Sequence, residues 1–126
     1  MNSNQPPSQS WTAKFAAAFR GLIVGTRGES SFYIHGFFTL AVVIAAAVLG
    51  VSRLEWGLLI LCITIVLVAE MFNSAIERLA QTLDPEPHPQ VADALDVASA
   101  AVLLAAVGAA IVGVIVLATR IWELVF

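Results

Sequence analysis

Three long apolar stretches dominate the hydrophobic pattern of the chain. They cover residues 30–52, 56–83 and 97–119, and the first and third contain no Lys, Arg, Asp or Glu. A helix of about 23 residues is long enough to cross a hydrocarbon core about 30 Å thick. The connection between the first two stretches is only a few residues long. We therefore predict an antiparallel pair of transmembrane helices followed by a third one.

A shorter amphipathic segment precedes the spans, over residues 11–27. Trp11, Phe15 and Phe19 recur at helical spacing, and Arg20 falls on the opposite side. Basic residues and aromatic rings on one helix are typical of a helix lying in the membrane interface. Packing of an ordinary helix against other helices is the alternative. We favour a surface helix because the hydrophobic spans follow directly.

Two polar segments lie outside these elements. Residues 1–10 contain Pro6-Pro7 and predict a disordered tail. Residues 84–89 alternate proline with acidic residues and a histidine, and proline removes backbone donors and restricts the residue before it. We predict that residues 84–89 form a water-side loop. The rest of the chain, 11–126, is predicted to form one domain.

The composition agrees with a membrane protein. Hydrophobic residues make up 60% of the chain and charged residues 12%, against about 45–50% and 25% in soluble domains. The net charge of -3 provides no basic surface for nucleic acid. A single cysteine, Cys62, excludes a disulfide within the chain. The predicted fold class is therefore all-α integral membrane.

The basic residues indicate an orientation. Four lie on one predicted side of the membrane and two on the other: Lys14, Arg20, Arg27 and Arg78 against Arg53 and Arg120. The side richer in Lys and Arg is usually cytoplasmic. We expect the N-terminus and the proline loop to be cytoplasmic.

Polar side chains gather on one face at the end of the second span. Glu70, Asn73, Ser74 and Glu77 are spaced so that all four share one helical face, and the two acids are about 10 Å apart along the axis. An unpaired carboxylate at mid-depth in a bilayer costs about 2.5 kcal/mol or more. This stripe should therefore face the bundle interior or a polar cleft.

Two more acids, Glu29 and Asp96, come directly before the first and third spans and should lie on the same side of the membrane. Carboxylate and amide oxygens suit Mg²⁺, which is often held together with substrate phosphates. A spare carboxylate can act as a general base toward a hydroxyl. The group favours phosphoryl transfer, although no phosphate-binding glycine loop is present. An ion pathway, a proton relay or simple helix pairing stays open. We interpret His35, early in the first span, as a capping or interfacial polar group.

Several motifs resemble one known family. They are EMFNSAIE at 70–77, DVASAAV at 96–102, Arg20-Gly21-Leu22, Glu29-x-x-Phe32-x-Ile34-His35 and Glu86-x-His88-Pro89. From about Phe15 to the C-terminus the chain resembles the prokaryotic diacylglycerol kinase and undecaprenol kinase family. This resemblance implies three-span subunits with a surface helix. It also implies a homotrimer in the bacterial inner membrane, with active sites shared between neighbours.

The resemblance implies that ATP and Mg²⁺ phosphorylate the hydroxyl of a membrane lipid, either diacylglycerol or undecaprenol. By motif match, Glu70 would be the general base, and Glu29 and Glu77 would hold the metal. The nucleotide side would include Asn73, Glu86, His88 and Asp96, with Arg20, Ser74 and Ser99 in support.

Three positions depart from the family pattern. Leu95 stands where the family has a lysine, Gln81 where it often has aspartate, and Ala98 where it often has glycine. Arg27 and Arg78 are candidate replacements for the lysine charge. A weak or catalytically silent relative that binds nucleotide or lipid is therefore the second hypothesis. A small ion or proton conductor is the third.

Overall fold

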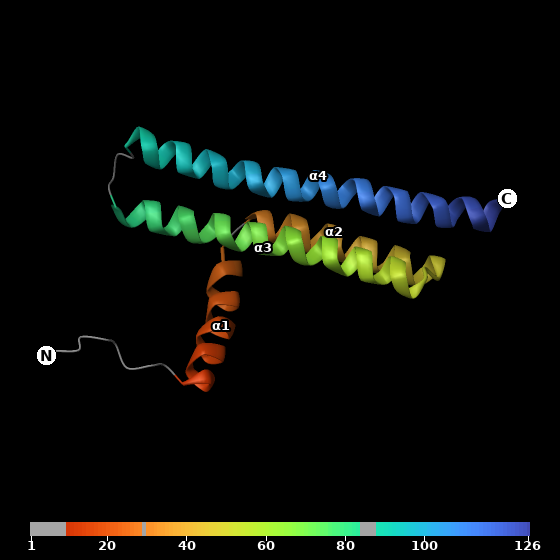
Figure 1. Cartoon of the computed structure of the whole chain (residues 1–126), viewed down its shortest axis with the longest axis horizontal. Coiled ribbons are helices and arrows are strands. Elements are labelled where there is room, and N and C mark those ends of the chain that lie inside the picture. Colours follow the sequence, from red (N-terminus) through yellow and green to blue (C-terminus); the bar gives the residue numbers. More distant parts are fainter. Residues whose placement is uncertain (1–9, 29, 84–87) are drawn as a thin grey trace, which may run out of the picture.

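The computed structural model describes residues 10–28, 30–83 and 88–126, and this part of the chain is almost entirely helical (Figure 1). The helices are α1 (Trp11–Thr26), α2 (Ser30–Leu49), α3 (Arg53–Leu83) and α4 (Pro89–Val125). Three parts of the predictions lie outside the described ranges: residues 1–9 of the predicted tail, Glu29, and residues 84–87, which include Glu86. Ser10 is the one tail residue that is described. Ser10 accepts a hydrogen bond from the backbone of Ala13 at 3.3 Å and caps α1.

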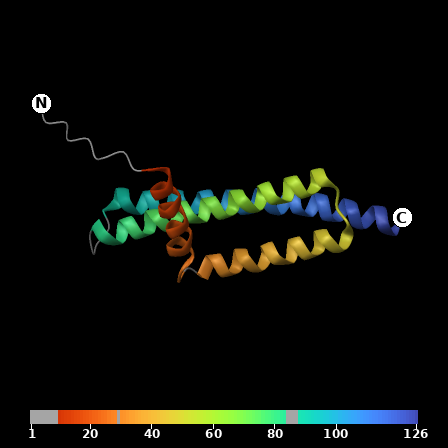
Figure 2. The same cartoon turned by 90° about the horizontal axis from the view of Figure 1, so that it is seen from below.

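Three of the helices, α2, α3 and α4, are long and apolar enough to span a membrane. They lie side by side, and α1 runs across them near the start of α2 (Figure 2). The chief packing is between α3 and α4, with α2 against both and α1 against α3. The predicted all-α membrane architecture is confirmed.

The helix ends differ from the expected spans on both sides of the α2–α3 turn and at both ends of α4: α3 begins at Arg53 rather than at residue 56, and α4 continues to Val125 rather than ending at residue 119. α2 ends at Leu49, and α4 begins at Pro89, well before the residue 97 predicted from the loss of charge. Proline fits the first turn of a helix because that position needs no N–H partner. The early start gives α4 a polar first part, which carries Asp93 and Asp96.

A tight turn joins α2 to α3. Gly50 has a φ of 64°, a left-handed conformation that ends α2 without strain. Ser52 and Glu55 then cap α3 reciprocally: the Ser52 N–H donates to Glu55 Oε2 at 2.6 Å and the Glu55 N–H donates to Ser52 Oγ at 3.3 Å. Arg120 on α4 donates to the Gly50 carbonyl at 2.6 Å. The turn thereby ties all three spans together.

Few apolar side chains are buried within a single copy of the chain. Ala46, Leu59 and Val116 form a small core, whereas Phe37 is 70% exposed and Leu104 is 74% exposed. So large an apolar exterior suits lipid or further protein rather than water. Because α2 and α4 are apolar on nearly every side, α3 carries most of the buried polar groups.

Candidate functional site

The polar stripe of α3 faces into the bundle. Glu70 is 3% exposed and Ser74 is 1% exposed, and Asn73 and Glu77 are half-buried. Phe72 lies on the other side of the helix and is exposed. The spacing predicted this orientation, because a lipid-facing carboxylate would be costly.

Glu70 is held by a histidine from the neighbouring helix. His35 on α2 places Nε2 at 2.7 Å from Glu70 Oε1, and the two side chains are 20% and 5% exposed. The sequence interpretation of His35 as a capping or interfacial group is wrong, because its partner is a buried acid. The sequence held part of the signal: α2 and α3 form an antiparallel hairpin, so the two residues lie at similar distances from the turn, but this does not indicate which way the His35 side of α2 faces.

Asn73 and Glu77 form the second polar pair of the stripe. Asn73 Nδ2 donates to Glu77 Oε1 at 2.7 Å. Asn73 Oδ1 is buried and accepts no hydrogen bond in the described part of the chain. A buried carbonyl oxygen without a donor, next to a carboxylate, is a donor set that suits a hard cation such as Mg²⁺.

The other predicted site residues are more scattered. Asp96 and Ser99 are exposed on α4, where Ser99 Oγ donates to the Leu95 carbonyl at 3.0 Å. His88 directly precedes α4, and Arg20 lies on α1; both are exposed. Glu29 and Glu86 fall outside the described residues. Across residues 10–28, 30–83 and 88–126, no three His, Cys, Asp or Glu side chains gather closely enough to hold a metal ion.

The C-terminal half of α3, which carries the polar stripe, also anchors α1. Arg78 Nη2 donates to the carbonyls of Val24 at 2.8 Å and Arg27 at 3.3 Å. These carbonyls belong to the C-terminal end of α1, where backbone acceptors lack helical partners. A Cβ on Gly25 would lie 3.3 Å from Met71 Cε, so the two helices approach closely there. These contacts hold the end of α1 against α3 at Met71 and Arg78.

Replacing Arg78 should loosen α1. In Arg78→Met we expect backbone amides 20–28 to exchange with deuterium about tenfold faster, because a charge-assisted hydrogen bond of about 1.5–3 kcal/mol is lost at a partly exposed site. Exchange followed by mass spectrometry on the protein in vesicles measures this. Arg120→Met is the matched control, since it removes the corresponding tie to Gly50 and should speed exchange at the α2–α3 turn only. Equal exchange at 20–28 in Arg78→Met and wild type would contradict the anchoring role.

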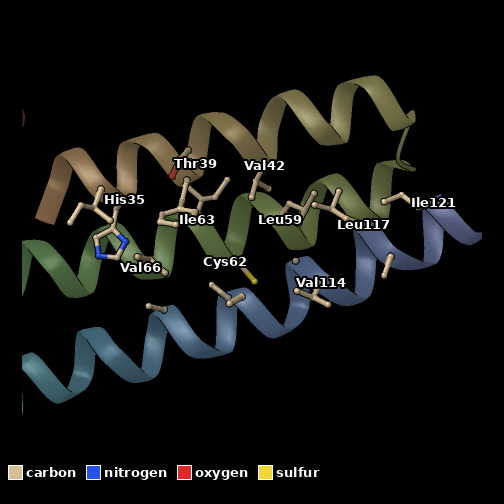
Figure 3. A pocket seen from close by; sticks show the side chains of 17 residues that line it. His35, Thr39, Val42, Leu59, Cys62, Ile63, Val66, Val114, Leu117 and Ile121 are labelled. Carbon is tan, nitrogen blue, oxygen red and sulfur yellow. The ribbon is translucent and has the colours of Figure 1, made fainter.

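An apolar cavity of about 610 Å³ lies between α2, α3 and α4. Figure 3 shows that the His35 side chain lies toward one end of this space. Thr39 and Cys62 contribute the remaining polar side-chain atoms, and the other lining residues are apolar or glycine. The size is within the usual range of small-molecule sites. A hydrocarbon chain is the kind of ligand that matches such a lining.

Comparison with known proteins matches the sequence of the chain to one family. The sequence model of the family described as prokaryotic diacylglycerol kinase matches residues 16–117. The matched range contains the whole α3 stripe, His35 and Asp96.

Curated relatives carry two names. The undecaprenol kinase of Bacillus subtilis is 31% identical over 102 residues, which are 81% of this chain and 83% of that protein. The diacylglycerol kinase of Helicobacter pylori strain 26695 is 35% identical over 102 residues, covering 79% of this chain and 80% of the relative. The diacylglycerol kinase of Escherichia coli K12 is 34% identical over 100 residues, covering 79% and 82%.

Proposed function

The chain belongs to the prokaryotic diacylglycerol kinase family and is a multi-pass membrane lipid kinase, and from this premise we propose that it transfers the γ-phosphate of ATP to the hydroxyl of diacylglycerol or an undecaprenol-type polyprenol. The observation that carries the proposal is the buried carboxylate of Glu70. It is paired with His35, whose ring lines an apolar cavity. A base beside a space suited to hydrocarbon is what phosphorylation of a lipid alcohol needs.

In the proposed reaction Glu70 is the general base. Its carboxylate takes the proton of the lipid hydroxyl as the oxygen attacks the γ-phosphorus, and the bond to the ADP leaving oxygen breaks. General base catalysis contributes about 10²–10⁴-fold to such a step. Burial of Glu70 keeps bulk water away from the proton acceptor and so favours the lipid alcohol over hydrolysis.

The proposed metal ligands are Glu77 and Glu29. Asn73 supports them, since its unpaired Oδ1 is oriented by the bond from Nδ2 to Glu77. Mg²⁺, when bound, neutralises phosphate charge. Arg78, next to Glu77 in the sequence, holds the carbonyls of Val24 and Arg27 at the end of α1.

The proposed nucleotide side lies at the polar end of α4. It comprises Asp96 and His88 at that end and Glu86 before it, together with Asn73 on α3, and we propose Arg20, Ser74 and Ser99 as supporting residues. We also propose a homotrimer with shared sites in the bacterial inner membrane, with a cytoplasmic N-terminus. The wide apolar exterior supports further subunit contacts.

Restoring a cation at position 95 should improve the use of ATP. Leu95 is half-buried near the aqueous end of α4, one turn from Ser99. We expect Leu95→Lys to raise kcat/KM for ATP about tenfold, because an ammonium group would neutralise charge on the transferring phosphates. Leu95→Met has a similar length and no charge, and should behave like wild type. Equal kinetics for the lysine and methionine variants would show that another group already supplies the charge.

Phosphate transfer from labelled Mg-ATP in lipid vesicles tests the proposed function. Diacylglycerol and undecaprenol are offered separately to the purified protein, with Glu70→Gln as the control. Transfer to one lipid that is lost in the variant supports the proposal and identifies the substrate class. Absence of transfer to either lipid from a folded oligomer would favour the second candidate, a silent relative that binds nucleotide or lipid, for which Leu95 is the specific observation.

A further inference from the structure

We propose that His35 is a positioning residue for Glu70 in the lipid kinase reaction. It holds one carboxylate oxygen of Glu70 so that the other oxygen accepts the lipid proton. The inference rests on the proposed function, and goes beyond it by assigning a role to a residue outside the stripe. Its basis is the 2.7 Å contact between His35 Nε2 and Glu70 Oε1, made between two spans.

The Glu70 carboxyl depends on this contact. In the described part of the chain, His35 makes the one hydrogen bond recorded to the Glu70 side chain. A buried carboxylate without a donor is strongly disfavoured, whereas a general base must be ionised before the proton transfer. An Nε2–H that donates to Oε1 satisfies both requirements. In the neutral ring this places the proton on Nε2 and leaves Nδ1 as an acceptor.

The geometry gives the two carboxylate oxygens different tasks. Oε1 is occupied by the histidine, so Oε2 is the oxygen left to take the hydroxyl proton. A carboxylate fixed by one oxygen loses rotational freedom, and fixed reacting groups contribute to rate through orientation. His35 acts here through Glu70, as the aspartate of a catalytic triad acts by orienting its histidine.

The cavity explains why the partner is on α2. The His35 ring belongs to the wall of the apolar cavity and Glu70 does not, so the ring is the part of the pair that faces this space (Figure 3). The hydroxyl end of a lipid whose chain entered the cavity would meet the pair at this end. A histidine on α2 at this end of the cavity can therefore hold the Glu70 carboxylate directly.

A purely structural role predicts something different. If the pair only tied α2 to α3, its loss would lower the free energy of unfolding and leave turnover by the folded fraction unchanged. If His35 positions the base, its loss lowers kcat in the folded protein. The binding of ATP should be unaffected, because the pair lies within the bundle and Asp96 lies on the exposed side of α4.

The first experiment compares His35→Leu with His35→Gln in vesicles. We expect His35→Leu to lower kcat about 100-fold with KM for ATP unchanged. His35→Gln should recover to within about tenfold of wild type, because its amide N–H can reach Oε1. Thr64→Val is the control for loss of a polar group within a span, since the Thr64 hydroxyl bonds the Ile60 carbonyl of its own helix. Wild-type kcat in His35→Leu, or equal losses in folded Leu and Gln variants, would overturn the inference.

The second experiment does not depend on kinase activity. The chain has two histidines, so ¹⁵N-histidine spectra of the full protein in vesicles resolve His35 beside the exposed His88, with His35→Gln giving the assignment. We expect His35 to be protonated on Nε2 and its signals to shift in Glu70→Gln, while those of His88 stay fixed. Unshifted His35 signals would overturn the pairing whatever the lipid assay gives. A wild-type protein that transfers phosphate to neither lipid would overturn the proposed function, and a shifted His35 signal would still confirm the pairing.

Discussion

Glu70→Gln is expected to lower lipid phosphorylation by about 10³-fold or more while the helices stay assembled. The glutamine side chain has the same shape as glutamate, but its amide does not accept the hydroxyl proton, so the general base contribution is lost. Its amide oxygen can still accept the hydrogen bond from His35, which currently reaches Oε1 at 2.7 Å. The variant therefore separates the chemistry of the carboxylate from its role in packing.

The measurement is the rate of phosphate transfer to each lipid at saturating Mg-ATP, with helical content and oligomer size determined on the same samples. Glu55→Gln provides a matched control. It removes a carboxylate from the same helix, but at the far end, where Glu55 caps α3 through the Ser52 N–H. We expect this control to keep turnover and to lose some stability, since the carboxylate that caps the start of α3 is removed. Turnover by Glu70→Gln within tenfold of wild type would remove Glu70 as the base.

Most of the architecture was predictable because the bilayer constrains it. Long apolar stretches had to become spanning helices, and the short connection between the first two had to form a hairpin, although the turn lies at residues 50–52 rather than at Ser52 to Glu55. The start of α4 was predicted late, at residue 97. The first charged residue beyond an apolar stretch indicates where the membrane ends, but the helix itself can continue into water as far as its capping and helix propensity allow.

The candidate site was predictable in part. Periodicity placed Glu70 and Glu77 on one face of α3, and their cost in lipid indicated which way that face points. The partner of Glu70 was missed, because α2 is apolar on nearly every side and its rotation about its own axis leaves little trace in the sequence. Only the packed structure shows that His35 turns toward α3. Asp96 was predicted just before the third span, whereas it lies within α4, and its contact with the stripe stays a prediction.

The structure also bears on which residue could replace the missing lysine charge. Arg78 was a candidate stand-in for the cation lost at Leu95, but its guanidinium donates to the carbonyls of Val24 and Arg27. Using Arg78 for phosphate would release the end of α1. The Leu95 and Arg78 variants therefore test linked questions, because a phosphate role for Arg78 would make its loss affect KM for ATP as well as the exchange of α1.

Glu77→Gln is expected to raise the Mg²⁺ concentration needed for half-maximal activity at least about tenfold, or to eliminate activity. The amide keeps an oxygen that can accept from Asn73 Nδ2, so the pair now joined at 2.7 Å can persist. What is lost is the negative charge next to the unpaired Asn73 Oδ1. Hard cations prefer carboxylate ligands, and changes even in the groups that support metal ligands typically cost 10–100-fold in metal affinity.

Activity measured against Mg²⁺ at fixed ATP gives the shift, and the electron paramagnetic resonance of bound Mn²⁺ gives metal affinity without relying on turnover. Glu123→Gln is the control. It removes an acid that pairs with Arg120 at 2.8 Å on α4, at the end away from the stripe, and it should leave both measurements unchanged. An unchanged Mg²⁺ dependence in Glu77→Gln would exclude Glu77 as a metal ligand. The stripe would then contain one catalytic acid, and Glu77 would serve to orient Asn73.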